Sequence, residues 1–149
     1  NTAPGFQLPC WRATRASIRD NTGYNKLIED IQFSDERISL CRQLAISKFN
    51  VMTPISNYNQ GNFPNQYLLL HGTLACLFAG ESAAVARNEL NYQDGGLQVP
   101  LEERFQYYSA LAGSYEGTFQ TMSQQFKIQA NLEEGYAQVA SDYAFLPAW

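Results

Sequence analysis

Few residues in this sequence could perform covalent or metal chemistry, and they lie far apart. The chain has one histidine, His71, and three cysteines, Cys10, Cys41 and Cys76. A zinc site requires several thiolates or imidazoles in one place, and neither a CxxC nor an HExxH pattern occurs. His71 lies five residues before Cys76, which differs from the three- or four-residue spacing of helix neighbours. We therefore predict no metal site and no catalytic role for these residues.

These four side chains have simpler structural interpretations. His71 lies in the most apolar segment of the chain, where we expect a hydrogen-bonded core histidine rather than a general base. Cys41 and Cys76 are expected to be small core residues. A small helical hydrolase that uses Cys41 or His71 is the enzymatic alternative, and replacing His71 by alanine would distinguish the two.

Sites for nucleotides and other phosphate ligands are also not indicated. The phosphate-binding patterns GxxxxGK[ST] and GxGxxG do not occur, and the DGG of residues 94–96 is a common turn. The basic segment WRATRASIR could contact nucleic acid, but arginines on one helical turn more often cover a protein surface or face solvent. Adjacent carboxylates stand at expected helix starts or solvent-facing positions: Asp35-Glu36, Glu102-Glu103 and Glu133-Glu134. We predict no cofactor.

The composition predicts one small folded domain that comprises residues 1–149. With 149 residues, of which 45% are hydrophobic and 16% charged, the chain is long enough for one core. Three separate cysteines do not make a disulfide framework, so a reducing compartment is expected. Aromatic residues make up 13% of the chain, with 9 Tyr and 9 Phe, and provide an unusually large supply of contact surface.

The charges are distributed unevenly along the chain. The formal net charge is -4, which disfavours a protein whose main task is to neutralise phosphates. Residues 1–50 hold seven of the 10 basic residues and five acidic ones, whereas residues 51–149 hold three basic and nine acidic ones. This asymmetry indicates either scatter over a solvated surface or two faces that meet different partners.

The sequence does not indicate a secretory signal or a membrane span. The N-terminus lacks a basic start followed by an apolar run. The most apolar stretch, residues 67–80, is shorter than the roughly 20 residues that cross a bilayer. We expect a buried helix there.

The N-terminal half of the chain predicts two helices after an extended arm over about residues 1–12. A short helix is possible in ATRASIRD, followed by a turn at residues 21–23. Ser34 is a suitable N-cap for a helix over about 35–50, in which Ile38, Cys41, Ala45 and Phe49 share one face. Pro54 and the segment SNYNQGN end that helix in a loop.

The second half predicts two longer helices. Pro64 suits the first turn of a helix over about 65–88 whose first half is buried on nearly all sides. A small hairpin or extended loop follows near residues 91–99. The long helix after Pro100 has a seam of apolar residues with a period of 3.5, and Gly113 and Gly117 in it indicate close contact with a neighbouring backbone. A tail of about residues 140–149 follows. The fold class is therefore mostly α, a bundle of three to four helices with one long C-terminal helix and extended termini.

Several segments together resemble a known type of protein. These are RASIRD, FSDERISLCRQLAISKFNVMTP, the apolar-to-alanine helix, LNYQDGGLQV and the aromatic helix that contains Tyr107, Tyr108 and Phe119. They are similar to the head-to-tail adaptors, also called neck or connector proteins, of tailed bacteriophages. The resemblance covers about residues 12–134, and its strongest parts are FSDE at a helix start and the YQDGG turn.

The resemblance implies a small structural virion protein without enzymatic activity, assembled in the host cytoplasm and located at the neck. It implies a homo-oligomeric ring beneath the portal protein, with twelve copies expected, that extends the DNA channel and meets a neck or tail protein below. Genome DNA would pass through without sequence-specific binding, and no membrane contact is expected. Such ring contacts are rich in Tyr, Phe, Trp, Met and Arg and poor in Lys, as this chain is.

Two sets of candidate site residues follow. The terminal aromatic residues are the candidates for partner binding: Trp11, Tyr143, Phe145 and Trp149. Because like charge prevents DNA from adhering, acidic residues of the second half are the candidates for lining the channel: Asp94, Glu102, Glu103, Glu116 and Glu133. The alternative function is another neck or tail-completion protein, or a monomeric helical protein-binding module, that forms no ring. The sequence does not distinguish the phage and host, the tail type or the segment that contacts the portal.

Overall fold

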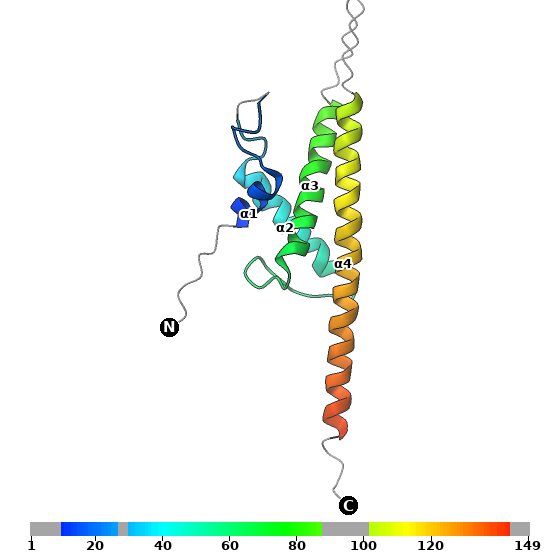
Figure 1. Cartoon of the computed structure of the whole chain (residues 1–149). Coiled ribbons are helices and arrows are strands. Elements are labelled where there is room, and N and C mark those ends of the chain that lie inside the picture. Colours follow the sequence, from blue (N-terminus) through cyan, green and yellow to red (C-terminus); the bar gives the residue numbers. More distant parts are fainter. Residues whose placement is uncertain (1–9, 27–29, 88–101, 144–149) are drawn as a thin grey trace, which may run out of the picture.

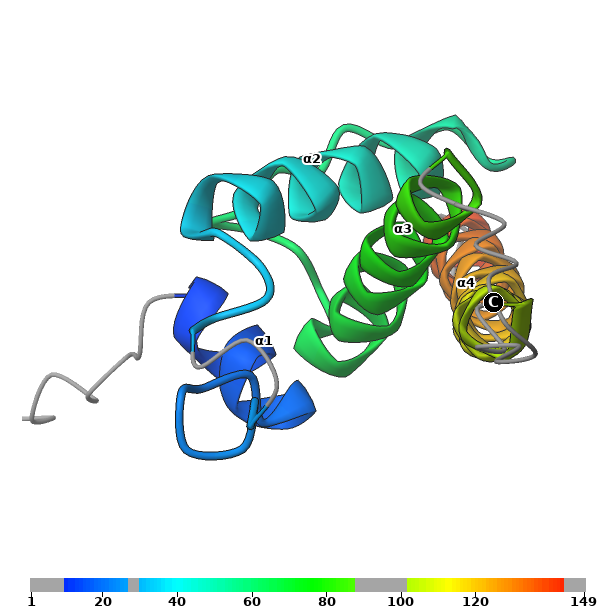
Figure 2. The same cartoon turned by 90° about the horizontal axis from the view of Figure 1, so that it is seen from above.

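The described residues form four helices, of which one is central and contacts the other three. The computed structural model describes residues 10–26, 30–87 and 102–143, with side chains at 11–26, 30–87 and 104–136. The helices are α1 (Cys10–Ile18), α2 (Asp35–Val51), α3 (Gln66–Arg87) and α4 (Glu102–Tyr143). Helix α3 contacts all three others, and α4 runs alongside it (Figures 1 and 2). No strand occurs in these ranges, which confirms the predicted helical bundle with a long C-terminal helix.

The starts of the two middle helices follow from side-chain caps. The Ser34 hydroxyl accepts a hydrogen bond from the Arg37 N–H, as predicted, and Asp35 and Glu36 add negative charge to the first turn of α2. Asn65, and not Pro64, caps α3, because its Oδ1 accepts hydrogen bonds from the N–H groups of Tyr67 and Leu68. Pro64 therefore lies before the cap rather than in the first turn.

Two predicted boundaries move outward. Helix α1 already begins at Cys10, and α4 continues to Tyr143, so residues 10–12 and 140–143 are helical rather than parts of an arm and a tail. The sequence has no proline between Cys10 and Ile18 or between Glu102 and Tyr143 that would end these helices. The predicted loop near residues 91–99 and the remaining parts of the arm and tail lie outside the described residues.

The first of two core clusters lies where α2, α3 and α4 meet. Phe49 contacts the rings of Tyr58, Phe63 and Phe126 at centroid distances of 5.8, 5.1 and 5.9 Å. The other buried members of this cluster are Ala45, Ile46, Leu68, Leu69 and Phe119. The predicted seam of α4 is confirmed, because its members Phe119, Met122 and Phe126 are the residues that α4 contributes here.

The second cluster joins α1 to α2 and α3. Phe33, Ile38, Cys41, Leu74 and Leu77 are buried in it, and Trp11, Ile18 and Tyr115 pack against it. Together the two clusters bury the predicted face of α2 (Ile38, Cys41, Ala45 and Phe49). Helix α3 supplies residues to both clusters and is therefore the centre of the fold.

Along α3, Gly72 lies between the residues of the first cluster and those of the second, and it sets how closely the helices approach. A Cβ atom at Gly72 would lie 2.7 Å from Cε2 of Phe119 on α4 and 2.9 Å from Cβ of Ala45 on α2. A helix therefore passes on each side of this position at a distance that only glycine permits. In contrast, a Cβ atom at Gly113 or Gly117 would meet nothing within 4 Å, so the prediction of close backbone contact at these two glycines was wrong within the described residues. The apolar seam of α4 lies on a different side of the helix from these two glycines.

Helix α3 has the length and composition of a membrane span, with 22 residues and a mean hydropathy of 1.5 in its most apolar window. Core helices of globular domains pass the same test. Here 39% of that window is buried within the described residues, including Leu68, Leu69, Leu74 and Leu77 in the two clusters.

We predict opposite effects of alanine at the two kinds of glycine. Gly72→Ala should lower the free energy of unfolding by about 1–3 kcal/mol, because the new methyl group overlaps Phe119 and Ala45. The matched variant Gly113→Ala should raise it by about 0.5–1 kcal/mol, because alanine favours an exposed helix. Urea denaturation followed by circular dichroism measures both, and equal effects at the two positions would contradict the packing described here.

Candidate interaction surfaces

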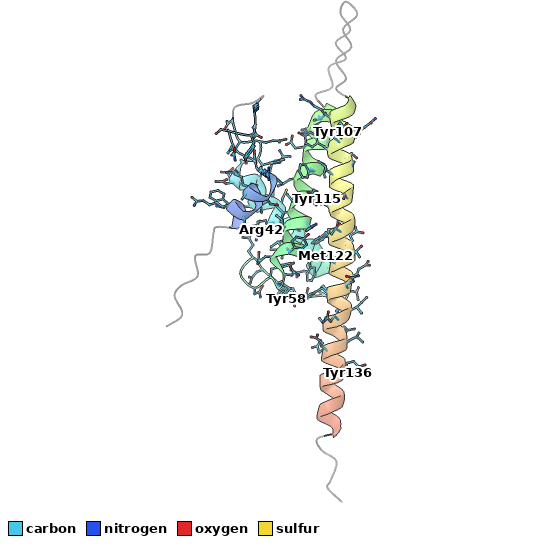
Figure 3. The ribbon with its side chains drawn as sticks, in the orientation of Figure 1. Arg42, Tyr58, Tyr107, Tyr115, Met122 and Tyr136 are labelled. Carbon is cyan, nitrogen blue, oxygen red and sulfur yellow. The ribbon has the colours of Figure 1, made fainter. Side chains whose placement is uncertain are left out.

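After Lys127, α4 extends beyond the other described helices (Figure 1). Every side chain from Ile128 to Tyr136 is exposed. Three of these are large and apolar and recur every four residues: Ile128, Leu132 and Tyr136, with 61%, 56% and 74% exposure. We call these three residues the distal ridge. Figure 3 shows Tyr136 on the part of α4 that lies far from the other helices.

A second apolar surface lies on the outer side of α2. Leu40 and Leu44 are exposed one turn apart, and Val51 is exposed in the last turn. We call these three residues the α2 ridge. The opposite side of the same helix is buried in the core, so α2 is apolar on two sides. A soluble helix normally presents polar residues to water, and apolar residues on both sides are typical of a helix with two neighbours.

A buried lysine connects α4 to the loop that follows α2. The Lys127 ammonium donates hydrogen bonds to the carbonyl oxygens of Met52 (3.0 Å) and Pro54 (2.6 Å) and to the Ser56 hydroxyl (2.7 Å). It also lies 4.5 Å from the centre of the Phe49 ring. The residue is 3% exposed, and burial lowers the pKa of Lys127 because the charged form loses hydration. Lys127 is the last buried residue of α4 before the distal ridge.

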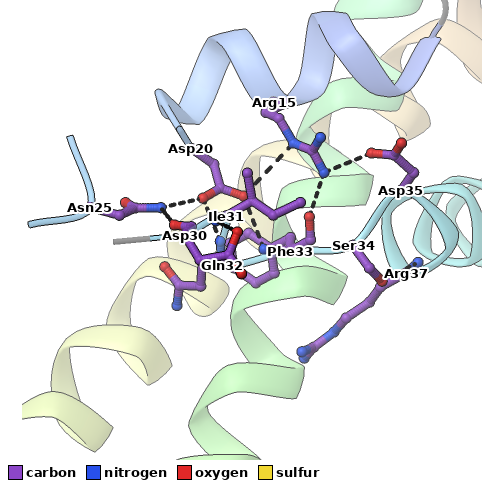
Figure 4. Close-up of polar contacts among 10 residues, drawn as sticks. All are labelled: Arg15, Asp20, Asn25, Asp30, Ile31, Gln32, Phe33, Ser34, Asp35 and Arg37. Atoms are coloured by element: carbon purple, nitrogen blue, oxygen red, sulfur yellow. Dashed lines mark hydrogen bonds and ion pairs between the residues drawn. The ribbon is translucent and has the colours of Figure 1, made fainter. Parts of the chain in front are cut away.

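A buried carboxylate organises the segment between α1 and α2 (Figure 4). Asp20 accepts hydrogen bonds from the backbone N–H groups of Gln32 (2.7 Å) and Phe33 (2.9 Å) and from the Asn25 side chain (2.6 Å). Arg15 of α1 donates to the Phe33 carbonyl oxygen and forms an ion pair of 2.7 Å with Asp35. The charged groups of this network bond to backbone groups and to one another. The network therefore fixes the position of α1.

Trp11 is the one candidate partner residue whose side chain is described. It is half-buried against the second core cluster, and the guanidinium groups of Arg12 and Arg15 lie 5.1 and 5.4 Å from the centre of its ring. One side of the indole thus attaches α1 to the core. Tyr143 lies at the last helical position of α4, while its side chain and residues Phe145 and Trp149 lie outside the described residues.

The candidate channel residues lie on α4 or before it. Glu116 forms an ion pair with Lys48 of α2 and accepts a hydrogen bond from Gln120, so its charge is compensated within the chain. Glu133 is exposed beside the distal ridge and accepts a hydrogen bond of 3.0 Å from Gln129. Glu102 and Glu103 form the first turn of α4 with side chains outside the described residues, as is all of Asp94.

The histidine and two of the cysteines, which are the residues able to perform covalent or metal chemistry, have the following surroundings. His71 is half-buried rather than a core residue. Its Nδ1 lies 2.9 Å from the Tyr67 carbonyl oxygen, and its ring packs on Tyr67 and Tyr115. Cys41 and Cys76 meet across the contact between α2 and α3, which spacing along the sequence did not reveal. Within the described ranges no three His, Cys, Asp or Glu residues come together as metal ligands would.

An open groove lies between the start of α4, the end of α3 and the turn after α1. Tyr24, Tyr107 and Tyr108 line it together with the basic residues Lys26 and Arg104. Glu81, which forms an ion pair with Arg37, and Leu111 also line it, so the groove offers aromatic, apolar and charged groups to a ligand.

Comparison of the chain with protein-family models, with curated proteins and with solved structures gave no match. The exposed ridges and the aromatic groove are therefore the observations on which a function has to be built.

The Lys127 contact predicts a specific loss of stability. Lys127→Met keeps the aliphatic stem but leaves the Met52 and Pro54 carbonyl oxygens without their donor, so we expect the free energy of unfolding to fall by about 1–3 kcal/mol. Lys26→Met, at an exposed position, should change it by less than about 0.5 kcal/mol. Chemical denaturation measures both, and equal effects would show that the Lys127 hydrogen bonds do not stabilise the fold.

Asp20 should be equally sensitive. Asp20→Asn replaces one acceptor oxygen by an NH2 group that faces backbone donors, and we expect a loss of about 2–3 kcal/mol. The exposed Glu134→Gln serves as the control for loss of one negative charge. Hydrogen exchange provides a second readout, because the amides of Gln32 and Phe33 should lose protection in the Asp20 variant alone.

Proposed function

We propose that this protein is a structural subunit of the neck of a tailed bacteriophage, which forms a homo-oligomeric ring between the portal protein and the tail and extends the DNA channel. The distal ridge is the observation that supports it most strongly. Isolated helices gain little stability in water, and burial of an apolar face against a partner normally stabilises them. Helix α4 continues past Lys127 with Ile128, Leu132 and Tyr136 in solvent, so this segment is suited to a second protein surface.

The two ridges together favour a head-to-tail contact between copies. In a ring, each subunit presents one surface to a different surface of its neighbour. The α2 ridge and the distal ridge are two such surfaces on different elements of one chain. In the assembly we propose, the α2 ridge of one copy packs against the distal ridge of the next.

The charge pattern is compatible with this arrangement. Arg12, Arg19 and Lys26 are exposed around α1, whereas Glu133 and Glu134 are exposed on the distal part of α4. These two regions lie on opposite sides of the molecule (Figure 1). Attraction between opposite charges on neighbouring copies would orient a head-to-tail contact, and acidic residues left facing the channel would let DNA slide.

The ridges predict the outcome of a mixing experiment. Leu132→Ser with Tyr136→Ser should abolish rings seen by electron microscopy of the chain co-expressed with its portal protein, and so should Leu40→Ser with Leu44→Ser. Each variant retains the surface that the other lacks, so a mixture of the two should form one heterodimer and no ring. Light scattering measures the masses. Because all four side chains are exposed, circular dichroism should be unchanged.

Other outcomes point to other functions. Rings that persist in both variants would exclude the ridge contact. If the unaltered chain binds the portal as a single copy and never closes a ring, the protein is a monomeric helical binding module. If only the distal-ridge variant loses assembly, the contact is between two distal ridges and the complex is a symmetric dimer.

A further inference from the structure

The packing of α2 on α3 places two cysteine side chains opposite each other. The two helices cross, and their chains pass this contact in opposite order, since Cβ of Ala45 lies against Gly72 and the Arg37 guanidinium lies against Gly80. Residues on one face of each helix follow at intervals of four, so Cys41 and Cys76 occupy the positions between these two pairs. Cys41 is buried in the second core cluster and Cys76 packs against that cluster, each thiol shifts the pKa of the other, and both are free.

The short distance between the two helices has a cause in the sequence. At Gly72 and Ala45 the helices are as close as their backbones permit, because a Cβ atom on Gly72 would lie 2.9 Å from Cβ of Ala45. Cys41 and Cys76 are each one helical turn from that point. A disulfide requires Cβ atoms about 3.5–4.5 Å apart, and such separations occur only where helix backbones approach this closely.

We propose that Cys41 and Cys76 form a thiol–disulfide exchange site, which reacts with a small disulfide such as oxidised glutathione to link α2 covalently to α3. This inference concerns the fold of the subunit and does not depend on the proposed neck function. Two small core residues would also fill this position, but packing alone requires neither thiol.

The surroundings assign different parts to the two cysteines. Cys76 is half-buried, whereas Cys41 is buried. The hydrogen bond from Cys41, supported by the positive charge of Arg37, lowers the pKa of Cys76 to about 7, although burial acts in the opposite direction. The same hydrogen bond and burial raise the pKa of Cys41. Cys76 is therefore the attacking thiolate and Cys41 the resolving thiol.

The exchange proceeds in two balanced steps. The Cys76 thiolate attacks one sulfur of the small disulfide, forms a mixed disulfide and releases one thiolate. Cys41 then loses its proton, attacks Sγ of Cys76 and releases the second small thiol. Two protein thiols are oxidised and one small disulfide is reduced to two thiols. In a reducing cytoplasm the cysteines stay free, and in oxidising surroundings the link forms.

Peptide mapping tests the site directly. After treatment of the folded chain with oxidised glutathione, trypsin should yield residues 38–42 joined to residues 49–87, and the chain should lose two hydrogens in mass. The initial rate should be half-maximal near pH 7, because the attacking group is the Cys76 thiolate. The linked form should need more urea to unfold than the reduced form.

Two variants control the experiment. Cys10→Ser should still form the link, whereas Cys76→Ser should form none and leave Cys41 unreacted while the chain is folded. If Cys76→Ser does not fold, Cys76→Ala takes its place, since alanine suits a small core position. A glutathione adduct on Cys76 that never resolves to Cys41, or a link that includes Cys10, would overturn the proposal. Failure to form a ring would leave these results unchanged.

Discussion

The close approach of three helices at Gly72 is the constraint on which the rest of the structure depends. Because this residue has no side chain, Phe119 of α4 and Ala45 of α2 both reach the backbone of α3. One core cluster lies to each side of this point, and α3 belongs to both. A larger residue would separate the helices and loosen both clusters at once, since protein interiors do not absorb extra volume easily.

Two buried charged side chains stabilise the irregular segments before and after α2, which apolar packing does not stabilise. Asp20 satisfies two backbone N–H groups before α2, and Lys127 donates to two backbone carbonyl groups after it. Each charge is removed from water and stabilised by hydrogen bonds that the irregular segments would otherwise lack. The two residues thereby fix both ends of α2 and, with them, the orientation of the α2 ridge and the direction in which α4 leaves the core.

The same packing leaves two apolar ridges outside the core. Helix α3 is too short to accompany α4 along its whole length, so Ile128, Leu132 and Tyr136 have no partner within the described part of the chain. An assembly of several copies would bury these residues as α3 buries Phe119. In the proposed assembly, contacts between chains would therefore be of the same apolar kind as the helix contacts within one chain.

The sequence alone determined the helices and the face that each buries. The Ser34 cap, the buried face of α2 and the seam that includes Phe119 all follow from local hydrogen bonding and from the helical period. The same reasoning failed at Gly113 and Gly117 and placed Pro64 in the first turn of α3, although it lies just before the cap. It also gave no sign of the Lys127 contacts or of the proximity of Cys41 and Cys76. Those contacts join residues far apart in the chain. Only the tertiary structure decides them, because helical periodicity defines which side of a helix is apolar but not which helix lies against it or in what register.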